Sequence, residues 1–204
     1  NEYTFGTYAR FKFTPAWSVK PNIYYSFYKF GANYFESQSQ ELYLSDAFQH
    51  QLIKPDLEFK YQMTEHQRLL FGIGNHFERV LSSRYQDNIA KKQETKFAFA
   101  QYELHHRQDK SKNITTGLRL DHNPIWGFNV SPKLSGQWPI RKHFILKSTY
   151  GMGFKSPDFR QLYLNFQNAA AGGYQVLGTE VINEKLLQIK DNIQSYFIDP
   201  NEIG

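Results

Sequence analysis

Cysteine is absent from the 204 residues, which excludes a disulfide framework and a cysteine-ligated metal site. No stretch reaches the roughly 20 consecutive apolar residues of a membrane helix, so a helical span is excluded. The net charge is +5, but lysines and arginines are scattered without a basic run, and nucleic-acid binding is therefore not predicted. The chain starts at Asn1 without an initiator Met or a charged-then-apolar leader, so we expect this start to be an internal cut.

Catalytic motifs are also missing from the sequence. It contains no nucleophile elbow, no phosphate-binding glycine loop and no HExxH pattern. His105 and His106 are adjacent, and neighbouring residues of a strand point to opposite faces. We therefore predict that the protein is not an enzyme and has no catalytic residue, no cofactor and no resident metal.

Aromatic residues are abundant, with 14 Tyr, 18 Phe and 3 Trp making up 17% of the chain. They favour strands, and apolar and polar residues alternate with a period of two. The alternating stretches are about as long as the 9–11 residues with which a tilted strand crosses a bilayer. Pro55 is expected to confine the first half of its strand to an edge or a bulge. About eight strands are predicted, at residues 3–13, 23–35, 53–62, 68–78, 97–105, 114–121, 128–138 and 144–155.

Alternation is clearest between residues 114 and 155, where one face of each strand is apolar and the other is charged or small. This pattern indicates a barrel wall with lipid outside and a polar lumen inside. Cross-strand pairing that keeps the lumen wall polar is the favoured role of the inward charges, and contact with cargo is the alternative. The predicted lumen-facing residues are Glu103, Arg119, Asp121, Lys133 and Lys147.

The connections differ in length. Links after the first, third, fifth and seventh strands are short, whereas those after the second, fourth and eighth are long and polar. The short HNPIWG link after the sixth strand is the exception. Short periplasmic turns and long outer loops are typical of outer-membrane barrels. Apolar residues three or four apart predict an amphipathic helix from Val181 to Phe197 in the last loop, either as a lid or as a cover for loop backbone.

Four short motifs follow one another in a fixed order. They are an AQ pair, a GxRxDH strand, an SPxL strand and a YGxGFxxP strand. In this order, they resemble the barrel of TonB-dependent outer-membrane receptors, with the likeness covering residues 67–187. The matching residues are Ala100 and Gln101, then Gly117, Arg119, Asp121 and His122, then Ser131, Pro132 and Leu134, then Tyr150, Gly151, Gly153, Phe154 and Pro157.

The resemblance implies an all-β fold, an antiparallel up-and-down transmembrane β-barrel of about 22 strands closed by an N-terminal plug. Residues 1–204 then form a partial wall of about eight strands with a short helix in an outer loop. The plug and the C-terminal strands are expected to lie outside this chain. The implied partners are the lipid bilayer, a small nutrient, and TonB contacting the missing plug region, in the outer membrane of a Gram-negative bacterium.

A ferric siderophore or similar metal chelate is the expected cargo, with energy from TonB. The loop at 156–197 is the most plausible binding element, because aromatic rings and an arginine can hold an anionic chelate by stacking and charge. A loop that simply packs on the barrel mouth is an equal alternative. The candidate contacts are Arg160, Tyr163, Tyr174, Gln175, His122 and Trp126.

Alternatives remain open. Haem receptors of this family usually carry a histidine in the loop after FxxP, but residues 157–187 contain none, leaving His122 and His76 as candidates. The usual NPxL element is also altered here. A haem or cobalamin receptor, a passive porin-like barrel and a soluble β-rich binding module are the competing readings.

Overall fold

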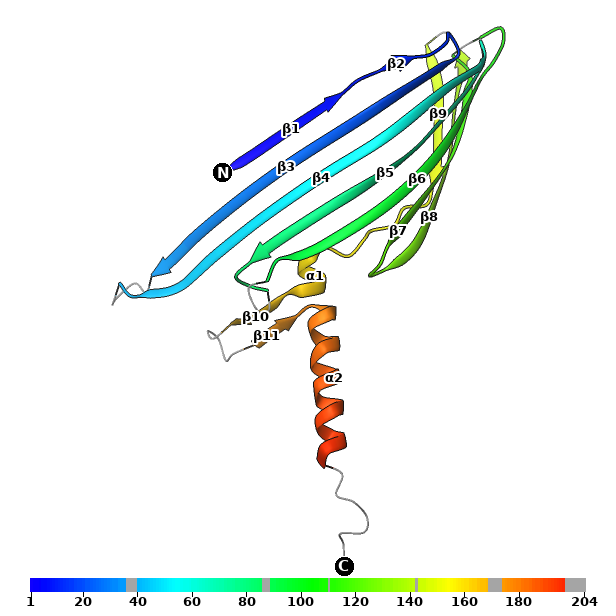
Figure 1. The fold of residues 1–204 in the computed structure, drawn as a ribbon. Helices are drawn as coiled ribbons and strands as arrows, with labels where there is room; N and C mark the ends of the chain where they lie inside the picture. The colour runs from blue at the N-terminus through cyan, green and yellow to red at the C-terminus, as the bar shows by residue number, and fades with distance from the viewer. Residues whose placement is uncertain (36–39, 86–88, 110, 142, 169–173, 197–204) are drawn as a thin grey trace, which may run out of the picture. The chain divides into compact units, whose positions relative to one another are not determined.

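The computed structural model describes residues 1–204 apart from 36–39, 86–88, 110, 142, 169–173 and 197–204. The described residues form a long antiparallel sheet, a small hairpin and two helices (Figure 1). The elements are β1 (Glu2–Tyr8), β2 (Phe11–Lys12), β3 (Trp17–Phe35), β4 (Leu42–Thr64), β5 (Gln67–Ser82), β6 (Lys91–His105), β7 (Asn113–Asn123), β8 (Gly127–Arg141), β9 (Phe144–Gly151), α1 (Phe159–Tyr163), β10 (Asn165–Asn168), β11 (Tyr174–Leu177) and α2 (Thr179–Tyr196).

The chain divides into two compact units. Unit 1 comprises residues 1–28, 50–79 and 92–156, and it contains most of the large sheet. Unit 2 comprises residues 29–49, 80–91 and 157–204, and it contains both helices and the β10–β11 hairpin. Strands β3, β4 and β5 contribute residues to both units.

The large sheet is an up-and-down meander. Its nine strands follow the order β1-β3-β4-β5-β6-β7-β8-β9, with β2 also pairing with β3. Figure 1 shows the successive strands side by side from blue β1 to yellow β9. The β1–β3 pair and the pairs from β6 to β9 are antiparallel, and the sheet ends at β1 and β9 without closing. The prediction of an all-β partial barrel wall is confirmed.

The first predicted strand, residues 3–13, is interrupted. β1 and β2 share one register against β3, since Tyr8 pairs with Asn22 and Phe11 with Val19. Between them, Ala9 donates its N–H to the carbonyl of Pro21 at 3.2 Å. Pro21 has no N–H to donate in return, so the ladder breaks there. The predicted loop at residues 14–22 is also wrong, because β3 begins at Trp17.

Several strands extend beyond their predicted ends. β4 runs unbroken from Leu42 to Thr64 between β3 and β5, so the expectation that Pro55 confines the first half of its strand to an edge is wrong, while a bulge there stays a prediction. One missing ladder donor does not interrupt this strand of 23 residues. Much of the segments predicted to be polar loops is strand, because β4 starts at Leu42 and β5 reaches Ser82. A strand that continues past the bilayer needs no apolar face, so its alternation vanishes from the sequence while its hydrogen bonds continue.

The last strand is shorter than predicted. β9 ends at Gly151, four residues before the predicted end at Lys155. Met152 still donates its N–H to Pro132 at 3.0 Å, but Pro132 has no N–H to return. The predicted helix is present two residues earlier than expected, as α2, while Phe197 lies outside the described residues. The sequence pattern did not reveal α1 or the β10–β11 hairpin.

The two faces of the unit 1 sheet differ sharply in polarity. Register pairs Leu118 with Pro132 and Leu120 with Val130, so these residues share one side, which we call the apolar face. Its side chains are exposed: Phe128 to 81%, Val130 to 51% and Leu134 to 52%. A soluble module would bury this face against a second sheet, and the exposure therefore contradicts that alternative. Neither described helix is both long and apolar enough to cross a membrane.

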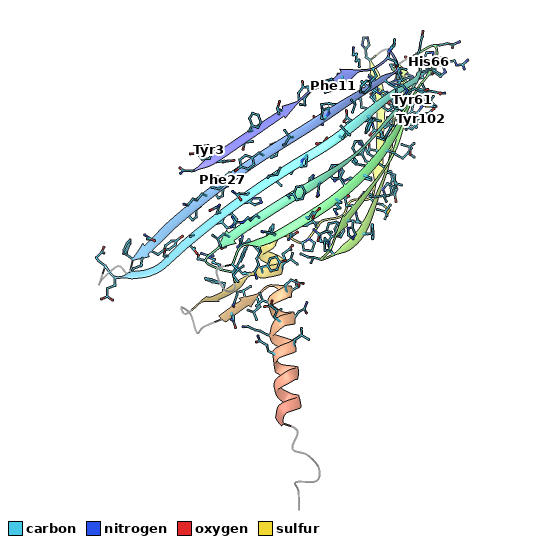
Figure 2. The ribbon with its side chains drawn as sticks, viewed as in Figure 1. Tyr3, Phe11, Phe27, Tyr61, His66 and Tyr102 are labelled. Atoms are coloured by element: carbon cyan, nitrogen blue, oxygen red, sulfur yellow. The ribbon has the colours of Figure 1, made fainter. Side chains whose placement is uncertain are left out.

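Aromatic rings gather on this face near the short turns. Trp17 stacks on Tyr61 with ring centroids 4.3 Å apart and meets Phe71 edge-on at 6.3 Å. Figure 2 shows Tyr61 and Tyr102 at the same end of the sheet as His66 of the β4–β5 turn. Tyrosine and tryptophan have an apolar ring and a polar tip, and they favour the boundary between lipid and water.

Glycines on the opposite, polar face let neighbouring chains approach closely. A Cβ on Gly72 would lie 2.6 Å from the carbonyl oxygen of Leu57 and 2.8 Å from the ring of Phe99. A Cβ on Gly74 would also be 2.8 Å from Cβ of Asp56 and would collide with Phe97. The rings of Phe97 and Phe99 thus occupy the space that the two glycines leave free.

We predict that Gly72→Ala lowers the free energy of unfolding of the complete protein by about 1–3 kcal/mol, the usual penalty for overpacking. The backbone oxygen of Leu57 cannot move aside as a side-chain tip can. Gly6→Ala is the matched control, because its Cβ would meet only the Tyr24 ring at 3.7 Å. Thermal unfolding in detergent measures both variants, and equal effects would contradict the close packing.

Candidate functional site

Helix α1 is held by its own sequence at the start of the segment after Pro157. Asp158 is the N-cap, and its carboxylate accepts a hydrogen bond from the N–H of Gln161 at 2.8 Å. The Asp158 N–H in turn donates to the side-chain oxygen of Gln161 at 3.0 Å, which completes a capping box. Phe159 and Leu162 are buried. The cap therefore fixes which side of this short helix faces the protein.

Unit 2 contains a small hydrophobic core. Val80, Tyr85 and Phe159 form it, with Phe48 packed against them. An isolated bridge joins Tyr85 to Leu164, and Gly178 donates its N–H to the Leu164 carbonyl. A Cβ on Gly178 would collide with the backbone of Leu162, so only glycine allows this approach of β11 to α1. These contacts tie α1, β10 and β11 to the end of β5.

A half-buried ion pair lies beside this core. Arg84 donates through Nε to Asp46 Oδ1 at 2.8 Å and through Nη2 to Oδ2, forming a two-pronged pair. Asp46 is only 9% exposed, and Ser83 also donates to it at 3.3 Å. The Arg84 guanidinium lies 4.9 Å from the ring centroid of Phe166 on β10. Its charge is thus satisfied within the protein and serves to hold structure.

A recess of about 340 Å³ opens between these elements. It combines aromatic rings, a neutralised ion pair and a second arginine, Arg160 of α1. Within the described residues no carboxylate pairs with Arg160, so its charge is free for an anionic ligand. The lining residues are Phe30, Tyr34, Asp46, Ala47, Phe48, Ser82, Arg84, Tyr85, Arg160 and Leu164.

Tyr85 contributes an unusual hydroxyl to this lining. The residue is 4% exposed, and its buried hydroxyl has no hydrogen-bond partner among the described residues. Burial raises the pKa of Tyr85 to about 12, with a smaller contribution from Asp158. A buried hydroxyl without a partner costs free energy. A ligand oxygen that reached it would recover that cost.

The predicted loop contacts are only partly brought together. Arg160 lines the recess, and Tyr163 packs beside it with its ring 6.5 Å from that of Tyr85 and with Lys91 Nζ 5.3 Å above it. Gln175 instead donates to Asn165 Oδ1 at 3.0 Å across the β10–β11 hairpin. Tyr174 belongs to the same hairpin, where its backbone pairs with Asn168.

His122 and Trp126 belong to unit 1 and do not join this group. His122 pairs with Lys96 and Phe128 in the ladder, and its ring lies 4.3 Å from that of Phe128 on the apolar face. His76 contacts Phe97 at 5.1 Å, and Phe97 pairs with Asp121 on the polar face. The two histidines therefore lie on opposite faces of the sheet and cannot hold one haem iron together. Trp126 packs on Phe154, with ring centroids 4.9 Å apart.

The five charged residues predicted to face the lumen share the polar face. Register sets Lys133 beside Gly117 and Lys147 beside Gln137, on the side of Arg119 and Asp121. Arg119 donates to Asp121 at 2.8 Å and lies 4.0 Å from the ring centroid of Phe97, while Glu103 pairs with Arg68 of the neighbouring strand. Such pairing fits a structural role; that this face bounds a lumen stays a prediction.

The sequence did not predict Asp46, Arg84 and Tyr85 as site residues, because the polar residues around them indicate loops. For Asp46 a signal was present. It lies an even number of residues from Phe48, His50 and Asp56, so its side chain is expected on the same face of β4 as theirs. No group of three or more His, Cys, Asp or Glu residues suited to a metal ion occurs in the part of the chain that the structure describes.

An unclosed antiparallel meander with an exposed apolar face and a charged opposite face is the wall of an outer-membrane β-barrel. The family model described as TonB dependent receptor-like, beta-barrel, matches residues 1–187. The chain belongs to this family, whose members are receptors rather than enzymes, and it is a protein of the Gram-negative outer membrane.

Relatives agree with this assignment. A 60-residue stretch is 30% identical to the iron-regulated outer membrane virulence protein of Vibrio cholerae serotype O1, in its Classical Ogawa and El Tor Inaba strains; it covers 29% of this chain and 9% of that protein. The siderophore receptor PirA from Pseudomonas aeruginosa has a similar fold, with a TM-score of 0.54 and 17% identity over 88% of this chain and 40% of that chain. The chain spans less than half the length of either relative.

We predict that Tyr85→Phe leaves the complete protein as stable as the parent or stabilises it by about 1 kcal/mol near neutral pH, because it removes an unpaired buried hydroxyl. The folded-state pKa of Tyr85 is about 12, above its ordinary value of 10.0. The unfolded chain therefore loses this proton first, and the parent's free energy of unfolding is unaffected below pH 10 and falls as the pH rises towards 12. The melting-temperature gap between variant and parent should therefore widen across this window.

A gap between variant and parent that stays constant across this pH window would contradict the raised pKa of Tyr85. A large loss of stability in Tyr85→Phe at neutral pH would contradict the unpaired hydroxyl.

Proposed function

We propose that the chain is part of the barrel of a TonB-dependent receptor that imports a ferric siderophore or similar anionic iron chelate. The polar face of unit 1 lines the lumen, and the recess of unit 2 contacts cargo. TonB supplies energy through a plug that belongs to another part of the protein. Family membership supports this role, as do an iron-regulated relative and a fold shared with a siderophore receptor.

The recess is the observation that carries the proposal. Arg160 lines it as a cation that no carboxylate of the described residues pairs with, and Phe30, Tyr34 and Phe48 provide ring surface within the same lining. An iron chelate with aromatic arms carries negative charge on flat rings, so it is bound by stacking and by a guanidinium at once. Because Asp46 already neutralises Arg84, the selectivity for an anion depends on Arg160.

The Tyr85 hydroxyl adds a directional contact. Tyr85 lines the same recess, and its buried hydroxyl lacks a partner among the described residues, so we propose that it donates to a chelate oxygen that reaches it. The recess volume of about 340 Å³ is at the lower end of the range for small-molecule sites. A chelate therefore inserts one arm there while the remainder contacts other parts of the receptor.

The alternatives explain less of this arrangement. Haem needs an axial ligand, and neither His76 nor His122 lines the recess. Cobalamin carries no comparable set of anionic aromatic arms. A passive porin has no plug, and its uptake survives loss of the proton gradient, whereas uptake by the receptor proposed here stops.

Arg160→Gln in the complete receptor should weaken binding of a ferric catecholate about tenfold or more, the usual effect of losing a charge-assisted hydrogen bond. Binding is measured by titration in detergent, with haem and cobalamin as comparison ligands. Arg10→Gln removes the same charge from an exposed position of unit 1 and should leave affinity unchanged. Unaltered catecholate affinity in Arg160→Gln, or tight binding of haem alone, would contradict the proposal.

A further inference from the structure

A second recess, of about 510 Å³, lies in unit 1 at the turn between β6 and β7. This is the end of the sheet at which Figure 2 shows Tyr61, His66 and Tyr102. Its lining joins an apolar wall to a basic rim. The lining residues are Leu104, His105, His106, Arg107, Gln108, Lys112, Asn113, Ile114 and Trp138.

The wall belongs to the apolar face of the sheet. Leu104 pairs with Ile114 across β6 and β7, and Ile114 pairs with Gly136 of β8. The Trp138 ring lies over Gly136, where a Cβ would collide with it. Leu104, Ile114 and Trp138 are exposed to 38%, 41% and 39%. The recess is therefore continuous with the surface that faces acyl chains.

The rim carries positive charge. Its described lining includes two cationic side chains, Arg107 and Lys112. Arg107 is exposed, and no carboxylate pairs with it within the described residues, Glu65 of the neighbouring turn included. Lys112 lies 3.8 Å from Asp109, whose carboxylate also accepts hydrogen bonds from Ser111. Asp109 thus offsets part of the charge of Lys112 and leaves that of Arg107 free.

The backbone holds this rim in one geometry. His106 donates its N–H to the Lys112 carbonyl at 2.9 Å, and Lys112 donates to the Asp109 carbonyl at 3.0 Å. The Gln108 N–H reaches Nδ1 of His106 at 3.3 Å, so the neutral imidazole carries its proton on Nε2. Within the described residues no acceptor pairs with His106 Nε2 or the Arg107 guanidinium, and the Lys112 ammonium has only Asp109 at 3.8 Å. Together these donors suit a phosphate group.

We propose that this recess binds the phosphate headgroup of an anionic phospholipid, with the acyl chains lying along Leu104, Ile114 and Trp138. The assignment rests on the membrane placement proposed above, in which this turn lies at the periplasmic boundary. A free phosphate would not need the apolar wall, and a neutral lipid would not need the unpaired arginine. Basic residues beside a bilayer contribute about 1 kcal/mol each to binding anionic lipid.

Native mass spectrometry of the complete receptor tests the proposal. The probes are phosphatidylglycerol and phosphatidylcholine with identical acyl chains, and their adducts are compared in the parent and in Arg107→Gln with Lys112→Gln. We expect the parent to prefer phosphatidylglycerol and the double variant to lose about fivefold of that preference for each charge removed. Lys96→Gln is the control, since Lys96 is an exposed cation of β6 outside the recess, pairs with His122 in the ladder and lies 3.6 Å from Glu94.

Each other outcome overturns the proposal. Equal binding of the two lipids by the parent, or an unchanged preference in the double variant, would remove the headgroup site. An equal loss in Lys96→Gln would show general surface charge, and displacement of phosphatidylglycerol by inorganic phosphate would show a free-anion site. If the parent forms adducts with neither lipid, the membrane placement itself is wrong. Failure of the headgroup site and failure of the membrane placement therefore give different results.

Discussion

Every backbone N–H and C=O inside a bilayer must be bonded within the protein, because lipid offers no partner. That requirement explains the long antiparallel ladder of unit 1, where β7 pairs residue by residue with β6 and with β8. On the same ground, we propose that the open edges at β1 and β9 pair with further strands of the barrel. Where proline removes a donor, at Pro21 and Pro132, the ladder ends or breaks.

Lipid on one side reverses the usual distribution of apolar residues. Phe128 is 81% exposed, while the described part of the chain has its main buried cluster at Val80, Tyr85 and Phe159 of unit 2. The side chains of the wall are therefore not packed in a buried core that also holds cargo-contacting residues. The side chains that we propose to contact cargo are placed instead by the capping box of α1 and by the Asp46–Arg84 pair. Binding residues on loops that a rigid scaffold positions are a general arrangement in proteins.

The strands that cross the bilayer could be predicted because lipid imposes alternation on them; Val130 and Leu134 illustrate it. Where β4 and β5 continue past the bilayer, the constraint is lost and polar composition conceals strand, so Asp46 was not identified. Helix α1 is five residues long and has one capping box. It is too short for the helical spacing of apolar residues to be visible in the sequence. Arg160 could be predicted from its chemistry, but its neighbours in the recess come from distant strands, and long-range pairing of that kind leaves no local pattern.

Adjacent residues of β8 give the most direct test of the central claim, that one face of this sheet meets lipid and the other a water-filled interior. The 204 residues contain no cysteine, so a single introduced thiol is a clean reporter within this chain. In the complete receptor in intact outer membranes, Ser135→Cys should react with a small water-soluble thiol reagent, and Leu134→Cys should react at least tenfold more slowly, since a thiol in lipid stays protonated. Equal reactivity at both positions, or faster reaction at Leu134→Cys, would contradict the account.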